Sequence, residues 1–216
     1  MLAYDHLIAQ TEPDRIQLQQ LPLLQQAATG QGSLDSYITF LTQAYHHVKE
    51  TVPLLMACGA ALPPRLNWLR ADLAHYIDEE IGHEEWVLND ITACGGDAER
   101  VRNGTPHLST ELMVAYAWDT VSRGNPVGFL GMVLVLEGTS VALATQVAGA
   151  LQKSLQLPDS AFTYLRSHGE LDREHVDDFA GLVNRIDHPE DLAAIEHCAR
   201  VFYHCYAEVF RSVPLD

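Results

Sequence analysis

Three short segments of this chain combine carboxylates and imidazoles at spacings that suit metal binding. In one of them, Glu80 and His83 lie three residues apart, which places both side chains on one face of a helix, about 60° apart around its axis. Helical bundles use the Glu-x-x-His spacing to present ligands to a pair of iron or manganese ions. Acidic residues crowd positions 78–85, so a solvated acidic face is the competing interpretation. Gly82 inside this helix predicts a close approach to a neighbouring element.

The segment with the most distinctive spacing holds His168, Asp172 and His175. These residues are spaced i, i+4 and i+7, so on a helix their side chains share a stripe about 40–60° wide. Two imidazoles and a carboxylate on one stripe form a set of metal ligands. The alternative is an exposed polar face, since other charged residues surround the three positions. We favour the ligand interpretation because both histidines and the aspartate fall on the stripe.

The remaining segment contains one carboxylate, Glu137, within the apolar run at residues 129–151. We expect it to be shielded from bulk water, where a carboxylate is costly unless something pairs with it. It is then hydrogen-bonded to a neighbouring polar side chain, protonated, or ionised beside a metal cation. In a membrane-spanning helix it would lie near the bilayer midplane, at a high cost. The run therefore predicts a buried core helix and no membrane partner.

The combined set of ligands contains carboxylates and imidazoles but no sulfur, which suits Fe(II) or Mn(II) better than structural zinc. Six protein groups exceed what one metal with an open coordination position needs, and they suit two metals. Three carboxylates do not neutralise two ferrous ions, so a fourth is expected. Glu50 is the predicted donor, and His46 and His47 nearby are the competing candidates.

The elements that must position these residues are helical. Gly and Pro residues divide the chain into long segments dominated by Ala, Leu, Gln and Glu, and strand-like alternation is almost absent. Ser33, Ser109 and Asp159 occupy expected N-cap positions. We therefore predict an all-α fold, one domain over residues 1–216, with about seven bundle helices. The predicted helices span residues 14–28, 34–61 with a kink at Pro53, 65–94, 109–123, 126–154, 159–186 and 190–212.

Composition narrows the class of partner. The chain contains 13 Lys+Arg and 29 Asp+Glu residues, a formal net charge of −16. This charge, without any stretch rich in Lys and Arg, argues against nucleic acid or an anionic membrane as a partner. Four cysteines lack a CxxC spacing, and no apolar leader follows Met1, so we expect a cytoplasmic protein with reduced thiols.

The ligand pattern resembles that of the heme-oxygenase-like di-iron oxidases and oxygenases, a group described as iron-containing redox enzymes. The resemblance extends from the helix at residues 43–50, through Glu80-x-x-His83 and Glu137, to His168-x3-Asp172-x2-His175. It implies a heme-oxygenase-like bundle without heme and two Fe(II) ions per chain, with manganese as an alternative. It also implies O2 and a small organic substrate, such as a fatty acid, an amino acid or an amine.

The resemblance further implies a homodimer. The apolar segment at residues 192–210 supports this, although it can equally pack into its own bundle.

Two other classes of function remain open. One is a metal-free enzyme of cofactor metabolism on the same fold, similar to thiaminase II or pyrroloquinoline quinone synthase. The other is a non-catalytic helical protein that binds metal. The residues assign no catalytic group, substrate or reaction outcome.

Overall fold

The computed structural model describes the backbone of residues 2–215, and the side chains of these residues except 170–177. No β-strand occurs in this part of the chain, so the predicted all-α class is correct. The helices are α1 (Ala3–Gln19), α2 (Pro22–Ala28), α3 (Leu34–Val48), α4 (Thr51–Ala61), η1 (Pro64–Leu66), α5 (Leu69–Glu80), α6 (His83–Ala93), α7 (Ala98–Arg102), α8 (Leu108–Ser122), η2 (Pro126–Phe129), α9 (Leu130–Leu155), η3 (Asp159–Ala161), α10 (Thr163–Asn184) and α11 (Pro189–Arg211).

The prediction of about seven helices is too low, because two of the long predicted segments are broken. The segment at residues 34–61 divides into α3 and α4 at Lys49 and Glu50, just before Pro53. Proline lacks a backbone N–H and fits the first turn of a new helix better than a helix interior. The chain also begins its first helix at Ala3 rather than near residue 14.

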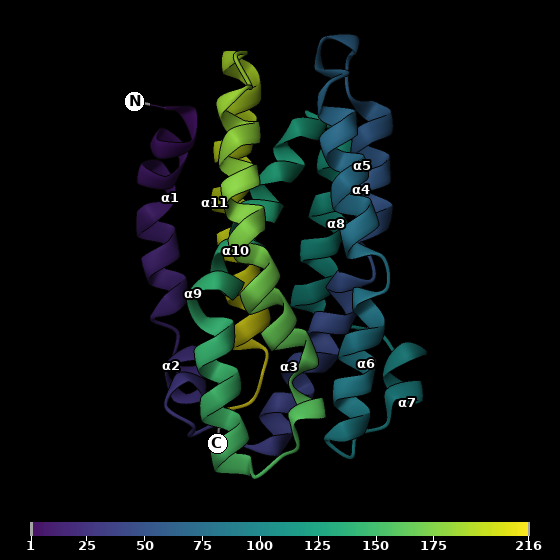
Figure 1. The fold of residues 1–216 in the computed structure, drawn as a ribbon, viewed down its shortest axis with the longest axis vertical. Helices are drawn as coiled ribbons and strands as arrows, with labels where there is room; N and C mark the ends of the chain where they lie inside the picture. Colours follow the sequence, from purple (N-terminus) through teal and green to yellow (C-terminus); the bar gives the residue numbers. More distant parts are fainter. Residues whose placement is uncertain (1, 216) are drawn as a thin grey trace.

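The segment at residues 65–94 breaks between α5 and α6, at Ile81 and Gly82. Gly82 has a φ of 92°, a left-handed conformation that glycine adopts without steric cost. A Cβ atom added to Gly82 would meet nothing within 4 Å. The expected close approach at Gly82 is therefore wrong, and the glycine serves the turn between two helices. In Figure 1, α5 and α6 follow one another in a single column.

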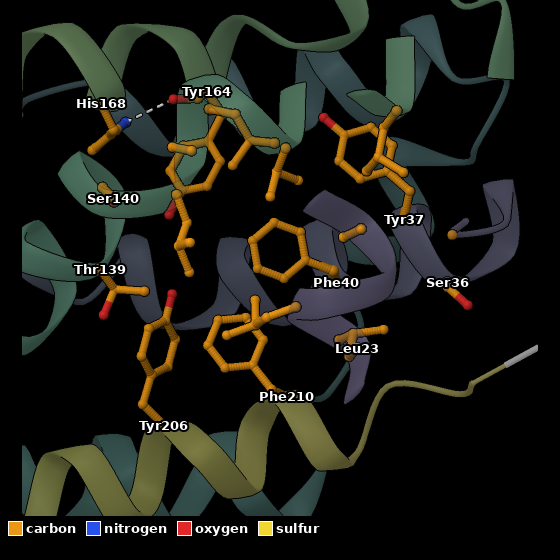
Figure 2. A pocket seen from close by; sticks show the side chains of 18 of the residues that line it. Leu23, Ser36, Tyr37, Phe40, Thr139, Ser140, Tyr164, His168, Tyr206 and Phe210 are labelled. Atoms are coloured by element: carbon orange, nitrogen blue, oxygen red, sulfur yellow. Dashed lines mark hydrogen bonds between the residues drawn. The ribbon is translucent and has the colours of Figure 1, made fainter. Parts of the chain in front are cut away.

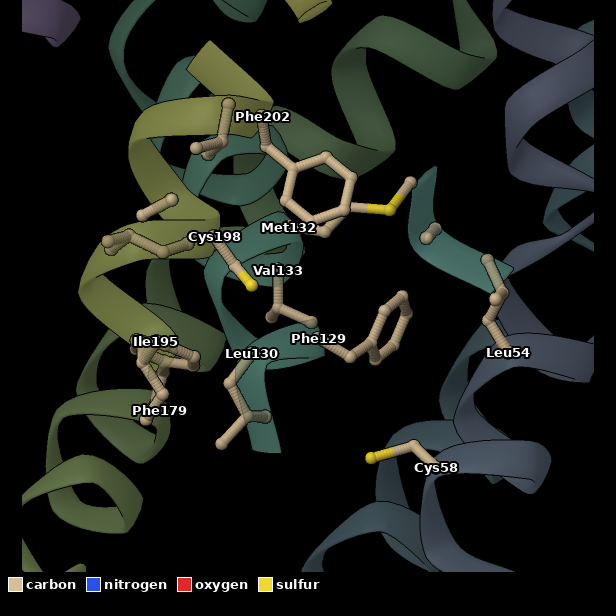
Figure 3. Packing of buried hydrophobic residues seen from close by; sticks show 14 of the residues in the cluster. Leu54, Cys58, Phe129, Leu130, Met132, Val133, Phe179, Ile195, Cys198 and Phe202 are labelled. Atoms are coloured by element: carbon tan, nitrogen blue, oxygen red, sulfur yellow. The ribbon is translucent and has the colours of Figure 1, made fainter. Parts of the chain in front are cut away.

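The central helix of the molecule is α9, which contacts α10, α11 and α2. Gly131 permits a close approach between α9 and α11, since a Cβ atom there would lie 2.5 Å from the backbone nitrogen of Ala199 in α11. Figure 3 shows Leu130, Met132 and Val133 of α9 near Cys198 and Phe202 of α11. The first turn of α9 is thus packed tightly against α11.

One helix of the described chain, Pro126–Leu155, is long and apolar enough to cross a membrane by length and composition. In the structure, 61% of its most apolar window is buried against the rest of the protein. This burial matches the predicted core helix.

Packing brings together the helices that contain the predicted ligands. α6 contacts both α3 and α10, and α10 lies along α9. The chain segments at residues 46–50, 80–83, 137 and 168 therefore approach one another in space. This arrangement buries Glu80, His83 and His168 inside the bundle.

Candidate metal centre

The compact core of the site is formed by Glu80, His83 and His168. Each offers a ligand atom, and these three atoms all lie within 4.8 Å of one another. The three residues are 9%, 3% and 9% exposed, respectively. Buried carboxylate and imidazole groups at this separation can bind one cation together.

Glu80 and His83 meet across the break between α5 and α6. The Nδ1 atom of His83 lies 3.1 Å from Oε2 of Glu80, so the two side chains converge as expected, although no continuous helix joins them. The His83 ring stacks on Trp86 with centroids 3.9 Å apart, and it meets His168 edge-on at 4.8 Å. These ring contacts fix the orientation of His83.

The ring of His168 is oriented by its own helix. Its Nδ1 atom lies 3.0 Å from the carbonyl oxygen of Tyr164, and since a carbonyl only accepts, Nδ1 must donate a proton. The Nε2 atom then has the lone pair. Such a backbone partner is the usual way in which a metal-ligating imidazole is held in one tautomer.

Asp90 of α6 caps the helix that contains His168. Its carboxylate accepts the backbone N–H groups of Thr163 and Tyr164, at 3.0 and 2.9 Å. Burial raises its pKa to about 6, against the opposing effect of these two hydrogen bonds. The sequence suggested Asp159 as the cap, but Asp159 begins the short helix η3. Asp90 was missed because its partners are 73 and 74 residues away.

Two other predicted caps can be compared with the structure. Ser33 caps α3, where its side-chain oxygen accepts the N–H of Ser36 at 3.1 Å. Ser109 lies inside α8, and the N-cap residue of that helix is His107.

A cavity borders the cluster, and we name it the chamber. Glu80, Glu137 and His168 line it. The hydroxyl oxygen of Tyr76 lies 3.5 Å from Oε2 of Glu137. Glu137 is only half-buried, and it also lines an outward-facing cavity beside Glu12 and Arg15. The expectation that Glu137 is shielded from water is therefore wrong. The polar residues lining the chamber include His47, Tyr76, Glu80, Glu137, Ser140, Tyr164, His168 and Tyr206.

Glu50 is not among the described residues that line the chamber, and its role as a metal ligand stays a prediction. It is the N-cap residue of α4, and its Oε2 atom accepts a hydrogen bond from Trp118 Nε1 at 3.1 Å. Because α3 ends at Val48, Glu50 lies beyond the last turn that faces the cluster.

His47, one of the two competing candidates, lines the chamber instead of Glu50. It is 2% exposed, and neither ring nitrogen has a hydrogen-bond partner. Burial lowers its pKa to about 3. His46 is equally buried and also without a partner, with its pKa lowered to about 4 mainly by burial, but it is not among the residues that line the chamber.

Asp172 and His175 belong to α10, but they lie outside the residues whose side chains the structure describes. Their role as metal ligands stays a prediction.

A second cavity, which we name the apolar cavity, adjoins the cluster at His168. In Figure 2, His168, Ser140 and Thr139 lie together on one side of this space, and Tyr37 and Ser36 lie on the opposite side. The rings of Phe40 and Phe210 lie between them. Its apolar lining includes Leu23, Leu24, Ala27, Phe40, Leu143, Ala144, Val147, Leu151, Leu165 and Phe210.

The residues present fit an iron or manganese ion. The cluster offers one carboxylate and two imidazoles, a set that suits Fe(II) or Mn(II), and Glu137 adds a carboxylate across the chamber. The four cysteines do not line the chamber. A thiolate-rich structural zinc site is therefore not what the described residues form.

Comparison with solved structures defines the fold as heme oxygenase-like. A protein of unknown function with this fold from Shewanella denitrificans aligns with a TM-score of 0.86 at 22% identity, over 97% of this chain and 91% of that one. A TenA homologue from Pseudomonas syringae gives 0.80 at 14% identity, over 97% and 91%. Heme oxygenase-1 from Synechocystis, in complex with heme, gives 0.75 at 10% identity, over 98% and 91%.

Comparison of the sequence with known families also identifies the family. Residues 38–207 match the pattern of the iron-containing redox enzyme family, and the chain belongs to that family. No curated protein matches the chain significantly.

Proposed function

We propose that this protein is a non-heme iron oxidase or oxygenase that binds two Fe(II) ions and uses O2 to oxidise a small organic molecule. The observation that supports this most directly is the buried convergence of Glu80, His83 and His168, with ligand atoms within 4.8 Å. Membership of the iron-containing redox enzyme family is consistent with it. Manganese in one of the two positions is compatible with the same ligands.

The chain's own residues would divide the work as follows. Glu80 and His83 bind one ion together with Nε2 of His168, whose tautomer is held by the Tyr164 carbonyl. Glu137 lies at the chamber wall, where its carboxylate can neutralise a second ion. Asp172 and His175 follow His168 on α10 and complete the proposed set. Ferrous ions, when bound, supply the electrons that activate O2.

The surroundings of the site are apolar on the side of His168. His168 lies at the boundary between the chamber and the apolar cavity, so a substrate in the apolar cavity would present its reacting atoms to the metal. Apolar walls limit the access of bulk water to that point. A fatty acid, an amino acid or an amine remain the substrate classes to compare.

The runner-up is a metal-free enzyme of cofactor metabolism, similar to thiaminase II or pyrroloquinoline quinone synthase. The fold likeness to a TenA homologue supports it. A thiaminase-like reaction relies on a cysteine nucleophile, whereas Cys58, Cys94, Cys198 and Cys205 are all absent from the lining of the chamber. The third candidate is a non-catalytic protein that binds metal with the same ligands.

The deciding experiment is an anaerobic Fe(II) titration with metal quantification, followed by exposure to O2. We expect two equivalents of iron and iron-dependent O2 uptake. Glu80→Gln should lower iron binding at least tenfold, and Glu79→Gln is the matched control, because Glu79 is a neighbouring glutamate paired with His75 at 3.4 Å. No binding would favour the metal-free enzyme, and iron binding without O2 uptake in the presence of candidate substrates would favour the non-catalytic protein.

We keep the homodimer as a proposal without the support of the last helix. Phe202, Tyr203, Tyr206 and Phe210 of α11 are buried within the chain itself. The apolar surface of this segment is therefore already covered. Light scattering that gives the mass of one chain would refute the dimer.

A further inference from the structure

The outward-facing cavity beside Glu137, which we name the outward cavity, offers room for a small molecule next to the metal centre. Its volume is about 510 Å³, within the usual range for small-molecule sites. The chamber contains about 50 Å³ and the apolar cavity about 70 Å³, so the outward cavity is the better candidate for a molecule larger than O2. Glu137 lines both the outward cavity and the chamber. A molecule in the outward cavity therefore lies beside a candidate iron ligand.

The outward cavity lies between α1 and α9. Residues 4–15 of α1 and residues 134–142 of α9 contribute two of its walls. The helix α1 packs against α11 and α10, and Figure 1 shows it at one side of the bundle, next to α11. The space between α1 and α9 is thus left open toward the outside of the bundle.

Gly138 keeps the α9 wall of this cavity open. It lies inside a helix, where glycine is about 1 kcal/mol less favourable than alanine. Gly131 on the same helix permits close packing with α11, but no described atom lies within 4 Å of a Cβ added to Gly138. The missing side chain of Gly138 instead leaves room next to Glu137, as at positions where a ligand approaches the backbone closely.

Tyr203 of α11 supplies a buried polar group on the wall of the outward cavity. It is 4% exposed, and its hydroxyl group has no hydrogen-bond partner among the described residues. A buried hydroxyl without a partner costs free energy, and a ligand that hydrogen-bonds to it removes that cost. Tyr203 therefore indicates a ligand independently of the space at Gly138.

The charged residues of α1 at the rim of the outward cavity favour a cation. Asp5, Glu12 and Arg15 line the cavity, and Nε of Arg15 donates to Oε2 of Glu12 at 2.9 Å. Asp5 is exposed and forms no ion pair with the described residues, so the rim keeps one uncompensated carboxylate. The ring of Tyr4, which also lines the cavity, adds a surface that attracts a cation. The net charge of −16 attracts cations from solution as well.

The metal centre has the opposite preference. The carboxylates of Glu80, Glu137 and the predicted ligand Asp172 do not neutralise two Fe(II) ions, so a loaded centre keeps excess positive charge. It repels an ammonium group, which is then held at the acidic rim. Between the rim and the metal centre the described lining contains apolar side chains, among them Leu134 and Phe179. The cavity therefore suits a molecule with a cationic group at one end and an apolar body.

We propose that the outward cavity is the substrate site and takes a primary amine, whose ammonium group lies at Asp5 and Glu12 while its apolar body extends past Tyr203 toward Glu137. This inference rests on the proposed function, because it treats the outward cavity as the approach to the iron ions. It selects the amine from the three substrate classes.

The test measures the binding of matched probes by calorimetry in the absence of O2. The probes are 3-phenylpropylamine, 3-phenylpropan-1-ol and 3-phenylpropanoate, which have the same apolar body and differ in the charge at the end. They are compared first on metal-free protein, because iron would itself bind the carboxylate. We expect the amine to bind about threefold more tightly than the alcohol, as for one exposed ion pair, and more tightly still than the acid. Its affinity should persist when two equivalents of Fe(II) are added.

Variants of three lining residues locate the bound amine. Gly138→Leu fills the space beside α9 and should weaken amine binding about tenfold or more. Gly149→Leu, at an open position of the same helix outside the cavity, should leave it unchanged. Tyr203→Phe removes only the hydroxyl group and should weaken binding about fivefold without loss of stability. Asp5→Asn should weaken it about threefold, and Asp14→Asn is its control, since Asp14 lies on α1 but does not line the cavity.

Three results would overturn the inference. They are tighter binding of 3-phenylpropanoate than of the amine by metal-free protein, equal amine affinity in wild type and Gly138→Leu, and loss of amine binding when Fe(II) is added. The proposed function is judged separately, by iron stoichiometry and O2 uptake in the wild type. Amine binding without iron binding would refute the iron enzyme and leave the amine site standing, whereas iron binding without amine binding would do the reverse.

Discussion

The carboxylate of Asp90 accepts the backbone N–H of Tyr164 at 2.9 Å, and this contact joins the two helices that contain His83 and His168. The carbonyl of the same Tyr164 accepts the Nδ1–H of His168 at 3.0 Å. Tyr164 of α10 thus donates its N–H to Asp90 of α6, and its carbonyl group orients the candidate ligand His168. Asp90 therefore acts on the site through Tyr164, at a distance from the metal.

Replacing Asp90 should disturb both stability and metal binding. In Asp90→Asn, the amide nitrogen cannot accept the second backbone N–H, so we expect a loss of about 1–3 kcal/mol in the free energy of unfolding. Iron affinity should fall as His168 loses its fixed position. Denaturant unfolding and an anaerobic Fe(II) titration measure the two effects.

Asp97 provides the control for this variant. Its side chain caps α7, accepting the N–H of Arg100 at 2.9 Å, but α7 contains no candidate ligand. Asp97→Asn should therefore change stability by about 1 kcal/mol or less and leave iron affinity unchanged. Equal iron affinity in Asp90→Asn and Asp97→Asn would show that Asp90 does not position His168.

Glu137→Gln should lower iron affinity at least tenfold while the metal-free protein stays folded. The substitution keeps the shape of the side chain and removes its charge, so it removes a ligand or a neutralising group from the chamber. Metal quantification and circular dichroism measure the outcome. Glu12→Gln is the control, since Glu12 lines the outward cavity beside Glu137 but pairs with Arg15. Unchanged iron content in Glu137→Gln would assign Glu137 a structural role.

Gly82→Ala should destabilise the protein by about 1–2 kcal/mol, because Gly82 has a φ of 92° that a Cβ atom disfavours. The turn also sets the relative position of Glu80 and His83, so iron affinity should fall as well. The control is Gly149→Ala, since Gly149 lies inside α9 with nothing within 4 Å of an added Cβ. That variant should gain up to about 1 kcal/mol. A melting temperature of Gly82→Ala equal to or higher than that of the wild type would show that the left-handed turn at Gly82 does not need glycine.

His47 should make the metal-free protein sensitive to acid. In the unfolded chain a histidine binds a proton below about pH 6.5, whereas burial keeps His47 neutral in the folded state down to about pH 3. Between these values the unfolded state binds more protons, so stability falls as pH decreases, by up to about 1.4 kcal/mol per pH unit. His47→Gln should reduce this slope when urea unfolding is compared at pH 7, 6 and 5. An identical slope in wild type and variant would refute the assignment.

Much of the fold could be predicted from local patterns. Helical composition, Pro and Gly breaks and the absence of strand alternation suffice for the all-α class, because these signals act over a few residues. The contact between Glu80 and His83 could also be predicted, because only three positions separate them in the sequence. Their side chains lie 3.1 Å apart even though a helix break falls between them. The break itself was not predicted, since Gly82 is compatible with both a helix interior and a left-handed turn.

Long-range packing decided the rest of the site. Whether Glu50 or His47 faces the cluster depends on where α3 ends and how it lies against α6, and one helical turn reverses the answer. Glu137 reaches an outward cavity because of how the N-terminal helix α1 lies beside α9. Asp90 caps a helix that begins 73 residues later in the chain. The spacing of residues in the sequence indicates which of them share a helical face. The direction in which that face points depends on how the apolar surfaces of several helices pack together, and no single segment contains that information.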